Sequence, residues 1–88
     1  MSELGPVGKI MESKLKVALS PTRIELIDES HQHHGHAGAN PLGESHFRLR
    51  ISAAALVGKG RVAQHRMINE VLAAELKSRV HALAIEVD

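Results

Sequence analysis

The fold is decided by the stretch HFRLRIS, residues His46–Ser52, in which polar and apolar side chains alternate throughout. Its apolar members, Phe47, Leu49 and Ile51, point to one side of an extended chain, and its cations and histidine point to the other. This is the pattern of a β-strand with one buried face. The stretch therefore predicts a sheet that is covered by helices on one side and open to solvent on the other.

Two further segments are predicted to be strands. Residues 23–26 (RIEL) alternate polar and apolar, and residues 80–87 (VHALAIEV) carry Leu83, Ile85 and Val87 on one face. A Gly- and His-rich segment, residues 29–44, joins the first two strands and ends in the turn residues NPLG. At about fifteen residues it is long for a hairpin connection, and long loops are often functional.

Helical spacing accounts for most of the remaining chain. An amphipathic helix of about fifteen residues is predicted to begin at Pro6, because proline is tolerated in a first helical turn, and to end before Pro21. A longer helix is predicted from about Arg61 to Leu76, and Ser52 is expected to cap a short helical turn at residues 53–56. The positions expected to be buried are Val7, Ile10 or Met11, Leu15, Ala18 and Leu19 in the first helix, and Val62, Ile68, Val71, Leu72 and Leu76 in the long one.

These elements give the order α-β-β-α-α-β. We expect a two-layer α+β architecture with a three-stranded sheet and the helices on one face. The 88 residues are the length of one domain, residues 1–88, with residues 1–5 as a flexible lead-in.

Composition limits the function. The chain is 43% hydrophobic and 24% charged, and its formal charge of +1 is too small to make nucleic acid or a membrane the default partner. One Phe and no Trp or Tyr leave almost no aromatic surface for stacking bases. Without cysteine the chain forms no disulfide and no thiolate metal site of its own. No run is long and apolar enough to span a bilayer, so we expect a soluble, cytoplasmic protein.

Five of the seven histidines lie between positions 31 and 46. Imidazole binds metals and exchanges protons near neutral pH. The cluster is therefore either a set of ligands, one or two of which complete a shared site, or a solvated polar loop without a role. A complete zinc site is less favoured, because structural zinc sites usually include thiolates. The loop candidates are His31, His33, His34 and His36.

The other histidines stand apart. His81 shares the alternation of Leu83, and spacing alone favours a satisfied core residue there. His65 lies within the long helix, where packing or capping is expected, and His46 lies on the polar face of its strand. Residues 58–60 (GKG) weakly resemble the glycine loop with which KH modules clamp nucleic acid, without its G-x-x-G spacing. No enzyme motif is present, and we expect a protein that is not an enzyme.

Taken together, the motifs resemble those of the BolA family over residues 4–87. The segments that carry the resemblance are 27–31 (IDESH) with His33 and 35–36 (GH), 43–47 (GESHF), 58–59 (GK), 65–67 (HRM), 75–76 (EL) and 80–85 (VHALAI). The resemblance implies an α-β-β-α-α-β fold similar to a class II KH module, in agreement with the order predicted from periodicity.

The resemblance also implies a function. Members of the family are partners of monothiol glutaredoxins, in a heterodimer bridged by a [2Fe-2S] cluster to which glutaredoxin and glutathione give thiolates and the BolA side gives histidine. Histidine can replace thiolate on one iron, as in Rieske centres. His81 matches the C-terminal ligand of the family, and His36 is the favoured loop ligand, with His33 and His34 as competitors. The expected role is iron–sulfur cluster trafficking or assembly, or iron regulation.

A second function is open. Because the fold is KH-like and some relatives act in transcriptional control, the alternative is a DNA-binding regulator, in which phosphates would meet Arg48, Arg50, Lys59, Arg61 and Arg66. The low charge and the lack of aromatic residues oppose it. A third reading is a KH-like scaffold with structural histidines. A homodimer of the free protein is also left open.

Overall fold

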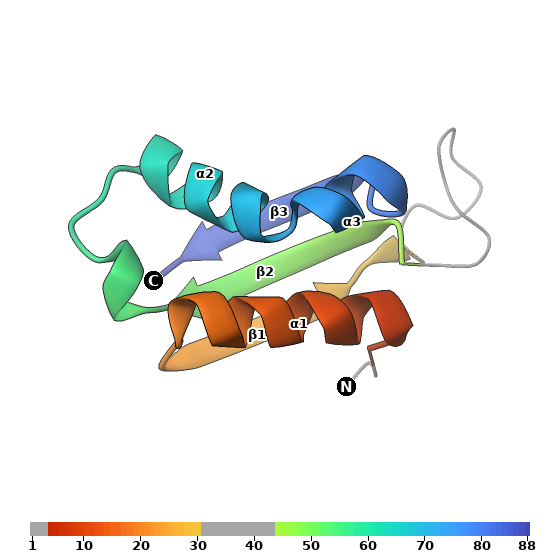
Figure 1. Ribbon diagram of the computed structural model, residues 1–88, viewed down its shortest axis with the longest axis horizontal. Coiled ribbons are helices and arrows are strands. Elements are labelled where there is room, and N and C mark those ends of the chain that lie inside the picture. Colours follow the sequence, from red (N-terminus) through yellow and green to blue (C-terminus); the bar gives the residue numbers. More distant parts are fainter. Residues whose placement is uncertain (1–3, 31–43) are drawn as a thin grey trace.

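The computed structural model describes residues 4–30 and 44–88, and the elements named below lie within them (Figure 1). They follow in the order α1 (Pro6–Leu19), β1 (Arg23–Asp28), β2 (His46–Ser52), the 3₁₀ turn η2 (Ala54–Leu56), α2 (Arg61–Val71), α3 (Ala73–Ser78) and β3 (Ala82–Val87). The strands form one sheet in the order β1-β2-β3, with β1 antiparallel and β3 parallel to β2. The predicted α+β fold is confirmed.

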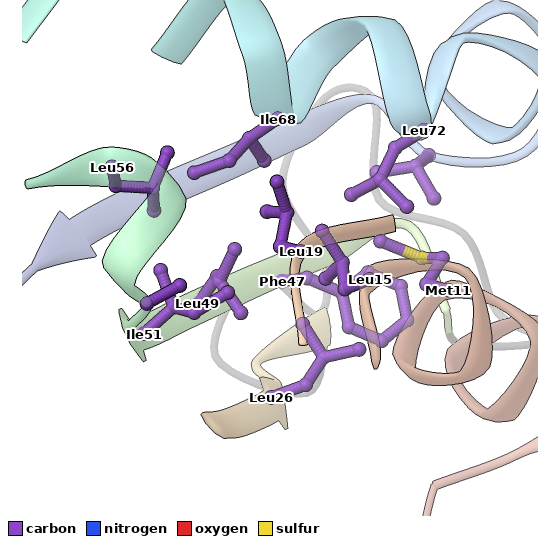
Figure 2. Packing of buried hydrophobic residues seen from close by; sticks show 12 residues of the cluster. Met11, Leu15, Leu19, Leu26, Phe47, Leu49, Ile51, Leu56, Ile68 and Leu72 are labelled. Carbon is purple, nitrogen blue, oxygen red and sulfur yellow. The ribbon is translucent and has the colours of Figure 1, made fainter. Parts of the chain in front are cut away.

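The helices lie on one face of the sheet, as predicted from the alternation in β2 (Figure 1). The apolar core fills the space between these two layers (Figure 2). Leu49 at the centre of β2 is fully buried and pairs in register with Leu26 of β1 and Ile85 of β3. The helical members of the same core cluster, with Leu72 at the junction of α2 and α3, are Met11, Leu15, Leu19, Ile68 and Leu72.

The first helix begins at Pro6 and ends at Leu19, as predicted. Ser20 follows with φ of 46°, a left-handed conformation that stops a helix. Met11, not Ile10, faces the core, and Ile10 is half exposed. The prediction for Ala18 was wrong, because it is exposed on the outer side of the helix.

The predicted long helix is two helices that meet at Leu72. This residue has φ of −101° and ψ of 16°, outside the α-helical range, and its side chain is fully buried. Val62 was predicted to be buried and is 72% exposed, because it lies in the first turn of α2, before the core residue Ile68. The predicted helical turn is present as η2, but Ala53 is its N-cap and Ser52 belongs to β2.

The open face of the sheet carries a ladder of ion pairs. Arg48 of β2 lies 2.9 Å from Glu29 and 2.7 Å from Glu86 of β3. Arg50, next on the same face, lies 3.3 Å from Glu25 of β1 and 3.5 Å from the same Glu86. The hydrogen bond from Arg48 holds the pKa of Glu86 below its ordinary value, and the carboxylates of Glu29 and Glu86 raise the pKa of Arg48.

This ladder predicts how stability depends on pH. A carboxylate whose pKa is lowered by folding stabilises the native state above its ordinary pKa of 4.5, and this contribution is lost as the pH falls through the lowered value. We expect Glu86→Gln to reduce stability slightly at pH 7 and the difference from the unaltered protein to shrink below pH 4.5. Denaturant unfolding of both proteins from pH 7 to pH 3 measures this difference in stability. Glu70→Gln on the exposed side of α2 is the control, and a constant difference across this range would contradict the prediction.

No helix in the described residues is long and apolar enough to cross a membrane.

Candidate functional site

The two ends of the histidine-rich segment are tied together by the carboxylate of Asp28, the last residue of β1. Its Oδ1 accepts hydrogen bonds from the backbone N–H of Ser30, at 2.9 Å, and from the Ser30 hydroxyl, at 2.5 Å. Its Oδ2 accepts the N–H of Glu44, which is 16 residues further along the chain, at 3.2 Å. One side chain thus joins the residues before and after the segment 31–43.

The hydroxyl of Ser30 completes this connection. It donates to Asp28 and accepts the backbone N–H groups of Ser45, at 2.9 Å, and His46, at 3.2 Å. A hydroxyl has one proton and two lone pairs, so its hydrogen-bonding capacity is filled. Ser30 and Ser45 are both buried, which makes these bonds costly to lose. We call Asp28, Ser30 and Ser45 the loop clamp.

The hydrogen bonds of the loop clamp predict that replacing Asp28 lowers the stability of the fold substantially. We expect Asp28→Ala to lower the free energy of unfolding by about 2–3 kcal/mol, because buried donors lose a charged acceptor. Asp28→Asn should cost less, because it keeps one carbonyl oxygen for Ser30. Urea denaturation measures both, with Asp88→Ala, an exposed carboxylate beyond β3, as the control. Equal, small effects of Asp28→Ala and Asp88→Ala would show that the clamp does not stabilise the fold.

Glu44 links the clamp to the first helix. It has φ of 58°, and its buried carboxylate accepts the backbone N–H of Gly8, in the first turn of α1, at 2.9 Å. An acidic group at this position satisfies a free N–H and complements the helix dipole. A Cβ on Gly5 would lie 2.7 Å from this carboxylate, so the close approach requires glycine there. Sequence reasoning gave these residues no role.

His81 lies beside the loop clamp, directly before β3. Its backbone N–H donates to the carbonyl of Ser45 at 2.7 Å, and the N–H of Ala82 donates to the same oxygen at 3.2 Å. The His81 side chain is exposed, so the expectation of a core histidine from spacing alone was wrong. The reason is that β3 begins at Ala82, two residues later than predicted, so His81 lies outside the strand, while Val80 is buried in the core.

The ring of His46, the first residue of β2, lies next to the ring of His81. The two imidazole rings are 6.3 Å apart between centroids and nearly parallel, with 22° between their planes. Nδ1 of His46 lies 2.9 Å from the hydroxyl of Ser45. At this end of the sheet β1 ends and both β2 and β3 begin (Figure 1). His46 is the first residue of β2 and His81 directly precedes β3, so both residues lie at the end of the sheet where the histidine-rich segment is attached.

The described residues contribute one exposed histidine to this end of the sheet, His81. Residues 4–30 and 44–88 hold no group of three or more His, Asp or Glu side chains that could bind a metal ion alone. His81 offers an exposed imidazole, which is a suitable nitrogen donor for iron. The loop candidates His31, His33, His34 and His36 lie outside the described residues.

The basic residues that were predicted to contact DNA phosphates fall into two groups. Arg48 and Arg50 are on the open face of the sheet, where each is paired with two carboxylates. Lys59, Arg61 and Arg66 are exposed on the turn before α2 and on α2 itself. The turn has φ of 81° at Gly58, which favours glycine. Within the described residues, Lys59, Arg61 and Arg66 form no ion pair, in contrast to Arg48 and Arg50.

His65 lies on α2, away from the loop clamp, and is half-buried, in agreement with the packing role expected for it. The preceding Gln64 donates from its side-chain amide to the carbonyl of Leu56 at 2.9 Å and so connects α2 to η2.

The sequence matches the model of the family described as BolA-like protein over residues 15–88. The chain belongs to the BolA-like family. It is 52% identical over 77 residues to a Sinorhizobium protein named for the cobS 5′ region, covering 86% of this chain and 83% of that one. It is 40% identical over 75 residues to the DNA-binding transcriptional regulator BolA of Escherichia coli, covering 85% of this chain and 68% of the regulator.

A solved structure agrees with the fold. The BolA domain of SufE1 from Arabidopsis thaliana has a TM-score of 0.88 and 43% identity, and the match covers 98% of this chain and 94% of that domain. The chain spans only 23% of the Arabidopsis SufE-like protein 1, so the BolA-like domain also occurs as part of a longer protein. None of these relatives is named as an enzyme.

Proposed function

We propose that this BolA-like protein is a non-enzymatic partner of a monothiol glutaredoxin and co-ligates a bridging [2Fe-2S] cluster in a heterodimer. The observation that carries the proposal is the exposed imidazole of His81, which stands beside the clamped ends of a segment with four histidines. Its role would be in iron–sulfur cluster trafficking or assembly, or in iron regulation.

The chain's own chemistry supports a shared cluster. It has no cysteine, so the partner and glutathione would supply every thiolate. His81 would supply one nitrogen ligand and His36 the other, with His33 and His34 as competing loop ligands. A bound cluster would supply one-electron redox chemistry and an iron–sulfur unit for transfer. The loop clamp contributes by fixing where the histidine-rich segment leaves the sheet, next to His81.

Reconstitution tests the proposal. The protein is mixed with a monothiol glutaredoxin, glutathione, ferric iron and sulfide, and the products are separated by size-exclusion chromatography. The proposal expects a one-to-one heterodimer whose visible circular dichroism differs from that of the glutaredoxin homodimer. A mixture that gives only the glutaredoxin homodimer and free BolA-like protein would contradict it. Omission of glutathione should also prevent formation of the heterodimer.

A DNA-binding regulator is the second candidate, favoured by the name of the Escherichia coli relative. Lys59, Arg61 and Arg66 would then supply the phosphate contacts, since Arg48 and Arg50 already pair with carboxylates. Binding to a random set of DNA duplexes across a salt series distinguishes the two functions. A regulator should select particular sequences and lose affinity steeply with salt, whereas weak and uniform binding would exclude this candidate.

A further inference from the structure

We infer that Ser45 and His46 position the imidazole of His81 for ligation, so that the ligand is held ready in the free protein. The inference rests on the proposed function, because it assigns His81 as the ligand and adds the residues that orient it. The sequence alone does not indicate that Ser45 or His46 orients His81. Ser45 directly precedes β2, and His46 fits the polar positions in the alternation of that strand.

Ser45 holds both histidines through different atoms. Its backbone carbonyl accepts the N–H groups of His81 and Ala82, which fixes the position of the His81 backbone. Its hydroxyl lies 2.9 Å from Nδ1 of His46, which fixes the plane of that ring. Ser45 is fully buried, and its own N–H is bound by the Ser30 hydroxyl, so the residue has little freedom to move.

The ring of His46 in turn restricts the orientation of the His81 side chain. Its ring lies nearly parallel to the His81 ring at 6.3 Å between centroids, within the range of interacting aromatic pairs. An exposed histidine normally samples several rotamers, each of which a metal ligand must give up on binding. A neighbouring ring that favours one rotamer lowers this entropic cost, which is the general benefit of preorganisation.

The first readout uses the free protein and needs no cluster. Three-bond NMR couplings to Cγ of His81 report its χ1 rotamers. In the unaltered protein they should indicate one dominant rotamer, and in His46→Ala and Ser45→Ala they should shift toward the average of several. Ser45→Thr keeps the hydroxyl and should restore the unaltered values.

Matched controls separate positioning from a general loss of structure. Ser52→Ala removes a hydroxyl at the other end of β2, and His65→Ala removes an imidazole from α2; both should leave the His81 couplings unchanged. Amide spectra of every variant check the fold. If His46→Ala does not fold, Ser45→Ala carries the test, because it keeps both rings and the backbone carbonyl.

The second readout is the cluster-loaded heterodimer. Outer partners that orient a metal ligand change metal affinity by about 10–100-fold when they are removed. We expect His46→Ala and Ser45→Ala to weaken the heterodimer about tenfold, at the lower end of this range, and Ser45→Thr to recover most of the loss.

The two proposals fail in different ways. If the unaltered protein forms no cluster-bridged heterodimer, the proposed function is wrong, and the couplings of the free protein still decide whether Ser45 and His46 order His81. The other outcome is a heterodimer that forms while Ser45→Ala and His46→Ala change neither the His81 couplings nor the affinity of the heterodimer. In that case the positioning role is wrong and the proposed function stands. A change in the couplings without any change in affinity also overturns the inference.

Discussion

Replacing His81 with alanine is expected to abolish the spectral signature of the mixed complex. The variant has no imidazole at position 81, and the chain has no thiolate that could replace this ligand. The loss should exceed the roughly 10–100-fold change caused by the outer hydrogen-bond partners of a metal ligand. The visible circular dichroism of the mixture should therefore become that of the glutaredoxin homodimer.

His65→Ala is the matched control for this experiment, because it removes a histidine on α2 and leaves the loop clamp intact. It should keep the signature of the mixed complex. Among loop variants, His36→Ala should reduce the signature more than His33→Ala or His34→Ala. A mixed complex with an unchanged spectrum in His81→Ala would show that another residue of this chain is the ligand.

Replacing Leu49 with alanine should give the largest loss of stability. The side chain is fully buried at the centre of the middle strand, between Leu26 and Ile85, and faces the helices (Figure 2). Leu→Ala changes at such sites cost about 2–5 kcal/mol, because transfer energy is lost and a cavity is left. We expect about 3–4 kcal/mol here, a large fraction of the roughly 5–15 kcal/mol that stabilises a typical domain.

Urea denaturation of the two forms measures this difference. Val17→Ala on α1 is the control, because Val17 is 82% exposed and its loss should change stability by no more than about 0.5 kcal/mol. Similar unfolding midpoints for Leu49→Ala and Val17→Ala would contradict the packing described for the core.

The sequence predicted the sheet well, because a half-buried strand has a local signal. The alternation of HFRLRIS marked the buried face of β2 and, through it, the side on which the helices pack. Helix boundaries that depend on tertiary packing were harder to predict from the sequence. Spacing alone extended one helix from Arg61 to Leu76, whereas the backbone leaves the α-helical range at Leu72, whose side chain is fully buried. Nothing in the neighbouring residues signals this break.

The candidate site was predictable only in part. The histidines stood out by composition, and the family resemblance singled out His81. The loop clamp could not be predicted, because the hydrogen bonds that join its two sides connect residues 15 and 16 positions apart. The same is true of Glu44, whose carboxylate caps a helix 36 residues earlier in the chain. The exposure of His81 depended on whether β3 begins at Val80 or at Ala82, and alternation does not fix where a strand starts.

The most direct test of the central claim is to ask whether a histidine nitrogen of this chain binds iron. The protein is prepared with ¹⁵N-labelled histidine, combined with unlabelled glutaredoxin and glutathione, and the reduced cluster is studied by pulsed electron paramagnetic resonance. We predict a strong ¹⁵N coupling to the cluster that is weakened or lost in His81→Ala and kept in His65→Ala. Identical spectra from labelled and unlabelled protein would contradict the account.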